Sequence, residues 1–190
     1  MAGGLGYVRR NRLVLGAISL DLFAVLLGGA SAMLPTYARD ILQVGPEGLG
    51  HLRAAPAVGA AVTALWLSVR PLKHNVGPKM LGGVALFGAA TIVFGLSRSM
   101  PLSLACLTLL GVGDMISVFV RQSLIQLHTP NEMRGRVGAV SSLFISGSNE
   151  LGEAESGLLA AAIGPIPAVV AGGIGAIIGT MLWGRWFPQL

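Results

Sequence analysis

The feature that most constrains this sequence is a series of six long apolar runs, separated by short connections that carry glycine and proline. A helix that crosses the hydrocarbon core of a bilayer needs about 20 mostly apolar residues, and each run is close to that length. The runs are apolar on all sides and do not alternate as the strands of a membrane barrel would. We therefore expect six transmembrane helices, over residues 13–34, 48–69, 80–97, 102–121, 137–163 and 166–187.

The composition supports a membrane protein, because only 11% of the 190 residues are charged and 53% are hydrophobic. A soluble domain carries roughly a quarter charged residues, so this chain could not cover a globule with polar surface. We expect an all-α, multi-pass integral membrane protein in contact with the lipid bilayer. Residues 13–187 would form the bundle, with a short segment (1–12) before it and a tail (188–190) after it. The first run could continue past Pro35 toward Leu42.

The basic residues predict the orientation of the bundle. Ten of the thirteen Lys and Arg residues fall on one side of the six predicted spans, at the two ends of the chain and in the even-numbered connections. Cytoplasmic loops carry an excess of Lys and Arg, so both termini are predicted to be cytoplasmic. The ten are Arg9, Arg10, Arg12, Arg70, Lys73, Lys79, Arg121, Arg134, Arg136 and Arg185.

Two other interpretations of the charge pattern are disfavoured. A net charge of +5 would suit nucleic-acid binding, but the basic residues stand in short clusters between apolar runs and form no single basic face. The N-terminal arginines and the following apolar run imitate a secretory signal. That run is too long for a signal, and Asp21 lies in its middle. We expect neither nucleic-acid binding nor cleavage.

No constellation of an enzyme is visible. The histidines, His51, His74 and His128, lie far apart in the sequence, and no metal-ligand spacing, nucleophile elbow or Walker A loop is present. The Gly-x-Gly pairs at 111–113 and 173–175 lie inside apolar runs with no strand before them, so helix packing is expected there. We predict no catalytic residue, no metal and no cofactor.

Ionisable side chains inside the spans are the informative residues, because each costs about 2.5–3.5 kcal/mol at the bilayer centre. Such residues normally face a bundle interior or a water-filled cavity. Asp21 lies near the middle of the first span. In the fifth span, Ser142, Ser146, Glu150, Glu153 and Gly157 recur at helical spacing on one face, and Asn149 borders them. We predict a substrate or proton pathway lined by Asp21, Asn149, Glu150 and Glu153.

A second group of charged residues is expected to form a gating or structural network: Arg53, Asp114, Arg121, Arg134, Arg136 and Glu155. For Arg53 with Glu153 or Glu155, a polar contact between helices stands as an equal alternative to a role in the pathway. Asp114 and Arg121 are seven residues apart, about 10 Å along a helix, so they are not expected to touch. Arg121 is expected to meet the inner connection or lipid phosphates.

Two stretches resemble transporters of the major facilitator superfamily. Residues 15–40, LGAISLDLFAVLLGGASAMLPTYARD, resemble the seventh helix of its enterobactin-exporter-like branch. Residues 111–157, GVGDMISVFVRQSLIQLHTPNEMRGRVGAVSSLFISGSNELGEAESG, are similar to the tenth and eleventh helices of that branch. The resemblance implies a twelve-helix, alternating-access fold of which this chain is the C-terminal six-helix half. It also implies an exporter of siderophores or drugs, driven by proton exchange, in the bacterial inner membrane.

Two departures from the family pattern matter. The first six helices are absent from this sequence, so a separate N-terminal half or a second copy of the chain would have to complete the cavity. The connection Arg70–Lys79, RPLKHNVGPK, lacks the acidic residue of the family's inner-loop motif. The alternatives left open are a structural or regulatory membrane protein without transport of its own, and, with less support, a small channel.

Overall fold

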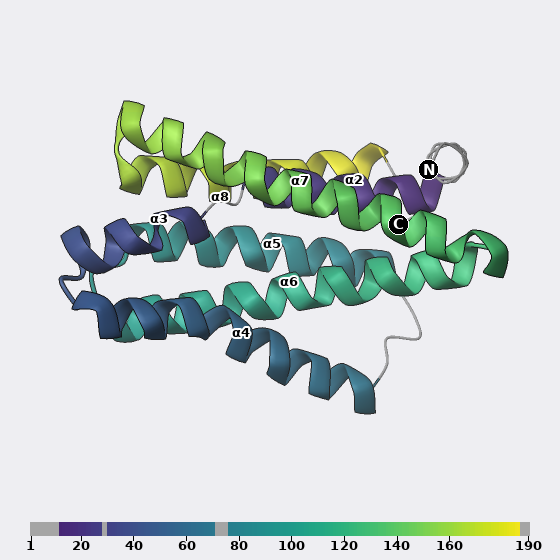
Figure 1. Cartoon of the computed structure of the whole chain (residues 1–190), viewed down its shortest axis with the longest axis horizontal. Helices are drawn as coiled ribbons and strands as arrows, with labels where there is room; N and C mark the ends of the chain where they lie inside the picture. Colours follow the sequence, from purple (N-terminus) through teal and green to yellow (C-terminus); the bar gives the residue numbers. More distant parts are fainter. Residues whose placement is uncertain (1–11, 28–29, 71–75, 187–190) are drawn as a thin grey trace.

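The computed structural model is a bundle of helices that run back and forth along one direction (Figure 1). It describes residues 12–27, 30–70 and 76–186. The predicted terminal segment 1–12 and tail 188–190 lie almost wholly outside this part, and so do residues 71–75 of the connection 70–79. The elements are α2 (Arg12–Leu27), α3 (Ala30–Thr36), η1 (Tyr37–Ile41), α4 (Gly45–Val69), α5 (Val76–Leu96), α6 (Met100–His128), α7 (Asn131–Ile163) and α8 (Pro165–Trp186).

Among the described residues, four helices are long and apolar enough to cross a membrane: α4, α5, α6 and α8. They coincide with four of the predicted spans and support a helical membrane fold. The other two spans, 13–34 and 137–163, stay predictions. The first corresponds to α2 and α3, which are individually short, and the second corresponds to α7, which is long but rich in polar residues. The cytoplasmic placement of the termini also stays a prediction.

The first run continues past its proline, as the sequence suggested. Pro35 lies inside α3, where its ring removes a backbone donor. The chain then widens into the π-helix η1, which ends with the Leu42 amide donating to the Tyr37 carbonyl at 2.8 Å. Gln43 and Gly45 adopt positive φ angles of 53° and 67°, and this turn directs the chain into α4.

The Tyr37 side chain fastens η1 to the end of α5. It is fully buried, its hydroxyl donates to the Gly95 carbonyl at 2.7 Å, and its ring stacks on Phe94 with centroids 4.6 Å apart. A buried tyrosine hydroxyl normally needs such a partner. The segment after Pro35 is therefore held by a buried side chain in addition to its backbone hydrogen bonds.

Glycines set the closest helix contacts. A Cβ placed on Gly111 of α6 would collide with the Pro56 carbonyl oxygen of α4, and one on Gly83 of α5 would lie 2.9 Å from the Gly113 carbonyl oxygen of α6. A Cβ on Gly88 of α5 would lie 2.8 Å from the Gly173 carbonyl oxygen of α8. Small residues let helix backbones approach in this way. The packing role predicted for the Gly-x-Gly pairs is confirmed for Gly111, Gly113 and Gly173.

Small residues also form the buried face of α8, which runs through Ala168, Gly172, Ala176 and Gly179. Gly172 and Gly179 approach α2 there, through the Leu27 carbonyl and the Phe23 ring. Small residues on α8 thus let it pack against α2 as well as α5.

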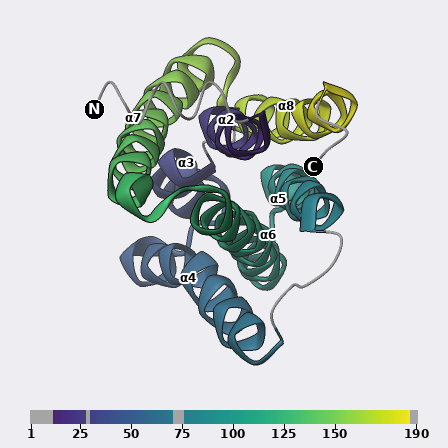
Figure 2. The ribbon, with the colours of Figure 1, turned by 90° about the vertical axis from the view of Figure 1, so that its right-hand side faces the viewer.

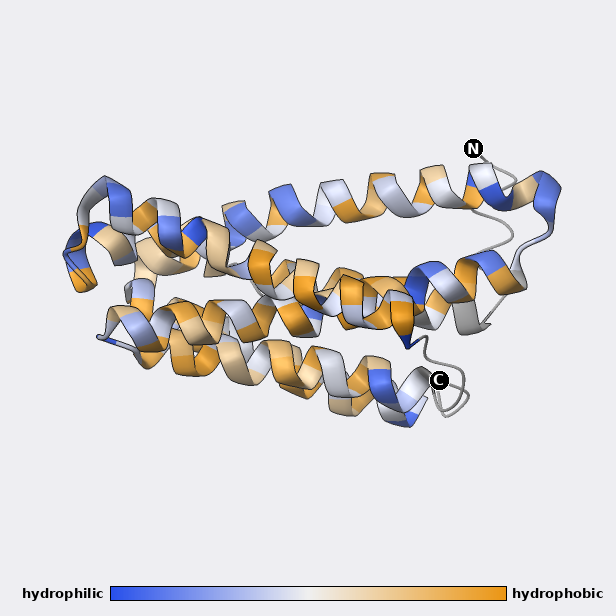
Figure 3. Ribbon diagram, turned by 90° about the horizontal axis from the view of Figure 1, so that it is seen from below, coloured by the Kyte–Doolittle hydropathy of each residue, from blue (hydrophilic) through white to orange (hydrophobic). Residues whose placement is uncertain are grey.

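The two sides of the bundle are formed by different sets of helices. Viewed along its length, α6 is flanked by α4 and α5, and α8 lies beyond α5 (Figure 2). On the opposite side, α7, α3 and α4 follow one another (Figure 2). Hydrophilic turns gather toward the two ends of the bundle, whereas its middle is mainly hydrophobic (Figure 3). This distribution fits a bundle that spans a bilayer.

Candidate functional site

The helix α7 has three different faces. Val137, Val140, Ser148 and Gly152 are buried against the bundle. Leu143, Leu151 and Leu158 are exposed, as expected for a surface that meets lipid. A third face carries the polar stripe predicted from the sequence: Ser142, Ser146, Asn149, Glu150, Glu153 and Gly157, all exposed in this chain. The chain itself therefore buries one face of α7 and leaves the polar one uncovered.

The local sequence explains why the polar face stays open. Gly157 has no atom within 4 Å of the place where a Cβ would stand, whereas Gly111 and Gly113 of α6 and Gly172 and Gly173 of α8 pack against neighbouring backbones. On α7, glycine therefore leaves space instead of making a close contact. The side chains of Glu150 and Asn149 have no hydrogen bond within the described residues, in keeping with their exposure.

A cavity of about 690 Å³ opens beside this face. Glu153 and Gly157 contribute from α7, and Arg53, Pro56 and Ala57 contribute from α4. The remaining wall is α3, from Ser31 to Pro35. The cavity thus joins three elements that lie side by side in the view along the bundle (Figure 2). Its volume is in the range of ordinary small-molecule sites, about 300–1,000 Å³.

The structure brings Arg53 and Glu153 to the same cavity. It does not join them: within the described residues, no ion pair within 4.0 Å links Arg53 to Glu153 or to Glu155. The direct contact between helices that stood as an alternative is therefore absent in this conformation. Glu155 is exposed on α7 and does not line the cavity.

The charged residues of α6 lie elsewhere. Arg121 is 3% exposed and Asp114 is partly buried, and each has an interaction partner. Arg121 was expected to meet the inner connection or lipid phosphates. Its burial argues against lipid phosphates and leaves the inner connection open. A buried guanidinium is tolerated only where partners satisfy it. Arg121 thus belongs to the interior of the bundle.

The basic residues of the connection between α6 and α7 are exposed. The Arg134 Nε donates to the Thr129 carbonyl at 3.1 Å, which supports the turn after α6. Arg136 is exposed one turn into α7. Asp21 belongs to α2, but its side chain lies outside the described residues, so its place relative to the cavity stays a prediction.

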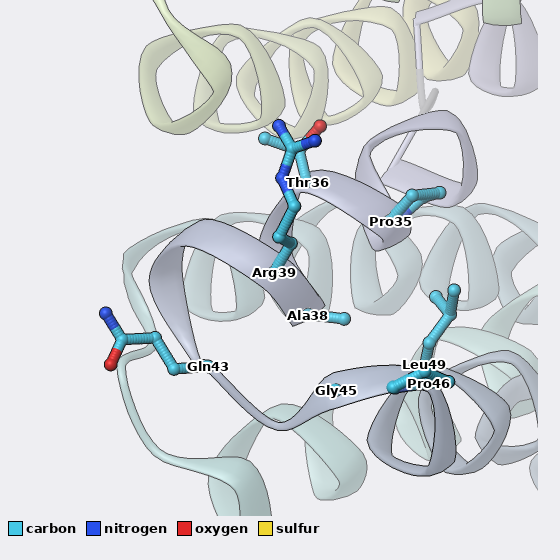
Figure 4. A pocket seen from close by; sticks show the side chains of 8 residues that line it. All are labelled: Pro35, Thr36, Ala38, Arg39, Gln43, Gly45, Pro46 and Leu49. Carbon is cyan, nitrogen blue, oxygen red and sulfur yellow. The ribbon is translucent and has the colours of Figure 1, made fainter.

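A second hollow, of about 510 Å³, lies between η1 and the start of α4. Ala38 and Leu49 point into it, while Gln43 extends away (Figure 4). Arg39 on its rim forms a two-point ion pair with Asp40, at 2.7 and 3.0 Å. This guanidinium lowers the pKa of the Asp40 carboxyl below its ordinary value. None of the predicted pathway residues lines this hollow.

Sequence reasoning missed several residues of the larger cavity: Ser31, Pro35, Pro56 and Ala57. Pro35 and Pro56 carried a usable signal, since a proline inside an apolar run removes a backbone hydrogen bond and often marks a cavity or a kink. Ser31 and Ala57 carried none, because small residues are common throughout these spans. Among the described residues, no group of three or more His, Cys, Asp or Glu side chains could hold a metal ion.

Comparison with known proteins gives a consistent result. The chain is 29% identical over 185 residues to the enterobactin exporter EntS of Escherichia coli O1:K1, which covers 96% of this chain and 44% of the relative. It is 32% identical over 166 residues to EntS of Shigella flexneri, which covers 83% of this chain and 40% of the relative. The chain therefore spans less than half the length of these curated relatives. No protein-family model and no solved structure matches it.

These relatives are named as exporters and not as enzymes, in agreement with the sequence-based expectation. Together with the apolar helices they indicate a multi-pass membrane protein. The matching region of the relatives is their C-terminal half. The chain is therefore similar to the C-terminal half of enterobactin exporters, in agreement with the resemblance to the major facilitator superfamily seen in its sequence.

Proposed function

We propose that this chain is the C-terminal half of a small-molecule exporter that works by alternating access and is driven by proton exchange. In this proposal α2 with α3, and α7, complete a set of six spans, and both termini lie in the cytoplasm. The observation that carries the proposal is the uncovered polar face of α7, beside a cavity that has room for a small molecule.

The free-energy cost of the charged residues on this face depends on what covers it. Lipid is a poor neighbour for Glu150 and Glu153, because a charged side chain near the bilayer centre costs about 2.5–3.5 kcal/mol. Water in a central pathway, with a second half on its far side, avoids that cost. The curated relatives are more than twice as long as this match, which supports a partner half. We infer that an N-terminal half, in the same polypeptide or in a separate one, or else a second copy, completes the pathway.

Within this proposal Asp21, Asn149, Glu150 and Glu153 line the substrate and proton pathway, and Asp21 and Glu150 exchange protons. The gating and structural residues are Arg53, Asp114, Arg121, Arg134, Arg136 and Glu155. A siderophore or a drug-like compound is the proposed cargo, since the relatives are named as enterobactin exporters. That name does not favour the alternative of a structural protein without transport.

The test uses the complete transporter to which this half belongs, reconstituted in vesicles with and without a proton gradient. Siderophores and drugs are offered as substrates, and flux is compared for the wild type, Asp21→Asn and Glu150→Gln. Glu132→Gln is a matched control, because Glu132 is an exposed carboxylate in the first turn of the same helix as Glu150.

We expect gradient-driven flux in the wild type and in Glu132→Gln. We expect flux that no longer responds to the gradient in one or both of the other variants. Unchanged coupling in both would remove Asp21 and Glu150 from the mechanism. A complete transporter that moves none of the compounds would refute efflux of these classes.

A further inference from the structure

The cavity between α3, α4 and α7 has charges of opposite sign on two of its walls. Arg53 stands on α4, and Glu153 stands on α7. Their neighbours in sequence fix both positions, because Leu52 is fully buried in the core and Gly152 is buried against the bundle. The two charged groups are therefore carried by firmly packed helices and not by loops.

Neither charge is satisfied by the chain itself. No ion pair within 4.0 Å and no hydrogen bond involves the Arg53 guanidinium or the Glu153 carboxylate within the described residues. By contrast, Arg39 and Asp40 at the bundle end form a two-point pair. Unpaired charges within a membrane protein generally mark a pathway for ions or substrates. A ligand that bears both signs of charge could satisfy both walls at once.

The cavity stays unfilled because several residues that line it are small or rigid. Gly157 lies one turn beyond Glu153 and has nothing within 4 Å of its missing Cβ. Pro35 and Pro56 line the cavity from α3 and α4, and proline has no mobile side chain to fill it. The volume of about 690 Å³ is sufficient for a small peptide or a compound of similar size.

We propose that this cavity binds a soluble zwitterionic small molecule, with its anionic group at Arg53 and its cationic group at Glu153. The guanidinium offers planar donors that suit a carboxylate or a phosphate, and the carboxylate accepts from an ammonium group. The proposal rests on the proposed function in that it makes this cavity part of the export pathway. It adds the chemical class of the ligand.

The test measures binding in the 190-residue chain and needs no transport. A cysteine introduced at Ala57, which lines the cavity, is labelled with a thiol reagent in nanodiscs of phosphatidylglycerol. The native Cys106 is 4% exposed and reacts slowly if at all. Ala61→Cys is the matched control on the same helix, exposed but outside the cavity lining.

Three compounds of one skeleton compete with labelling: the zwitterionic dipeptide Phe-Gly, its N-acetylated anion and its amidated cation. We expect Phe-Gly to protect Ala57→Cys at about tenfold lower concentration than either singly charged form, since one charge-assisted contact is worth at least a factor of ten. Arg53→Gln should remove the advantage over the cation, and Glu153→Gln the advantage over the anion. Labelling of Ala61→Cys should not change.

Equal protection by all three compounds, or protection by none, would overturn the proposal. The proposal would also be overturned if phosphatidylethanolamine in the nanodisc protected Ala57→Cys and Phe-Gly had no further effect. The occupant of the cavity would then be a lipid headgroup. Size-exclusion profiles identify variants that fail to fold, and Arg53→Lys and Glu153→Asp then replace the neutral variants. If the complete transporter exports a compound but the 190-residue chain does not discriminate among the three dipeptides, only the ligand class is refuted. If the chain discriminates among them but the complete transporter shows no flux, only the proposed function is refuted.

Discussion

The contacts of α6 with α4 and α5 and the polar face of α7 use glycine for opposite purposes. On α6, Gly111 and Gly113 let neighbouring backbones touch, and a side chain there has no room. On the polar face of α7, Gly157 faces open space. The glycines of α6 lie in contacts between helices of this chain, which we call the closed region. The polar face of α7 has no partner among the described residues, and we call it the open region. The comparison shows that composition alone does not separate packing glycines from cavity glycines.

The largest loss of stability is expected when a single methyl group is added in the contact between α6 and α4. Gly111→Ala places a Cβ against the Pro56 carbonyl oxygen, on rigid backbone, so the helices must separate. Overpacking of this kind costs about 1–3 kcal/mol or more. Gly157→Ala, in open space, should change stability by less than about 0.5 kcal/mol. Heat-induced loss of the monodisperse peak in detergent measures both, and equal losses would refute the contrast.

A smaller contrast should appear within one helix. Gly83→Ala in α5 brings a Cβ within 2.9 Å of the Gly113 carbonyl oxygen, whereas its neighbour Gly82 has nothing within 4 Å. We expect Gly83→Ala to lower the melting temperature and Gly82→Ala to leave it equal or higher, since alanine favours helix by up to about 1 kcal/mol over glycine. The same thermal assay applies. A lower melting temperature for Gly82→Ala than for Gly83→Ala would contradict the packing.

Tyr37→Phe tests the anchor at the end of the closed region. The variant keeps the ring on Phe94 but leaves the Gly95 carbonyl without its donor. Loss of one buried hydrogen bond should cost about 1–3 kcal/mol. Thr91→Val on α5 is the control, because its hydroxyl bonds only to the Phe87 carbonyl of the same helix. We expect a smaller loss there by thermal denaturation, and a larger one would argue against a special role for Tyr37.

In the open region, Glu150→Ala should leave the stability of the isolated chain within about 0.5 kcal/mol, because an exposed side chain without partners stabilises little. The same variant in the complete transporter should impair coupling, if the proposed pathway is correct. Thermal denaturation and flux are measured on the two preparations. Strong destabilisation of the isolated chain would show that Glu150 has a structural role.

The smallest effect concerns the exposed pair at the end of the bundle. The pKa of Asp40 is lowered by Arg39, so the pair stabilises the fold above the unfolded pKa of the carboxyl, and this is lost as the pH falls through the lowered value. Exposed pairs contribute little, and the difference between Asp40→Asn and wild type at neutral pH should be close to the detection limit. It should vanish at low pH. A difference that grows under acid would reverse the assigned sign.

Much of the architecture was predictable from the sequence. Long apolar runs give membrane-crossing helices because lipid offers no partner for an open backbone, and the boundaries fall near the glycine and proline breaks. The polar stripe of α7 was visible because helical periodicity places residues four apart on one face. The interior position of Arg121 was not predictable, since nothing local distinguishes a charge that faces lipid phosphates from one that faces a neighbouring helix.

The sequence by itself determined that this chain is a helical membrane protein and which residues of α7 share a polar face. The physical reason is that hydropathy and helical periodicity are local properties. Only the tertiary structure decided that this face is uncovered and that Arg53 and Glu153 share one cavity without touching. It alone separated the glycines that close a contact from those that leave space. These facts depend on which helices lie next to one another, and that is settled by packing across the whole bundle.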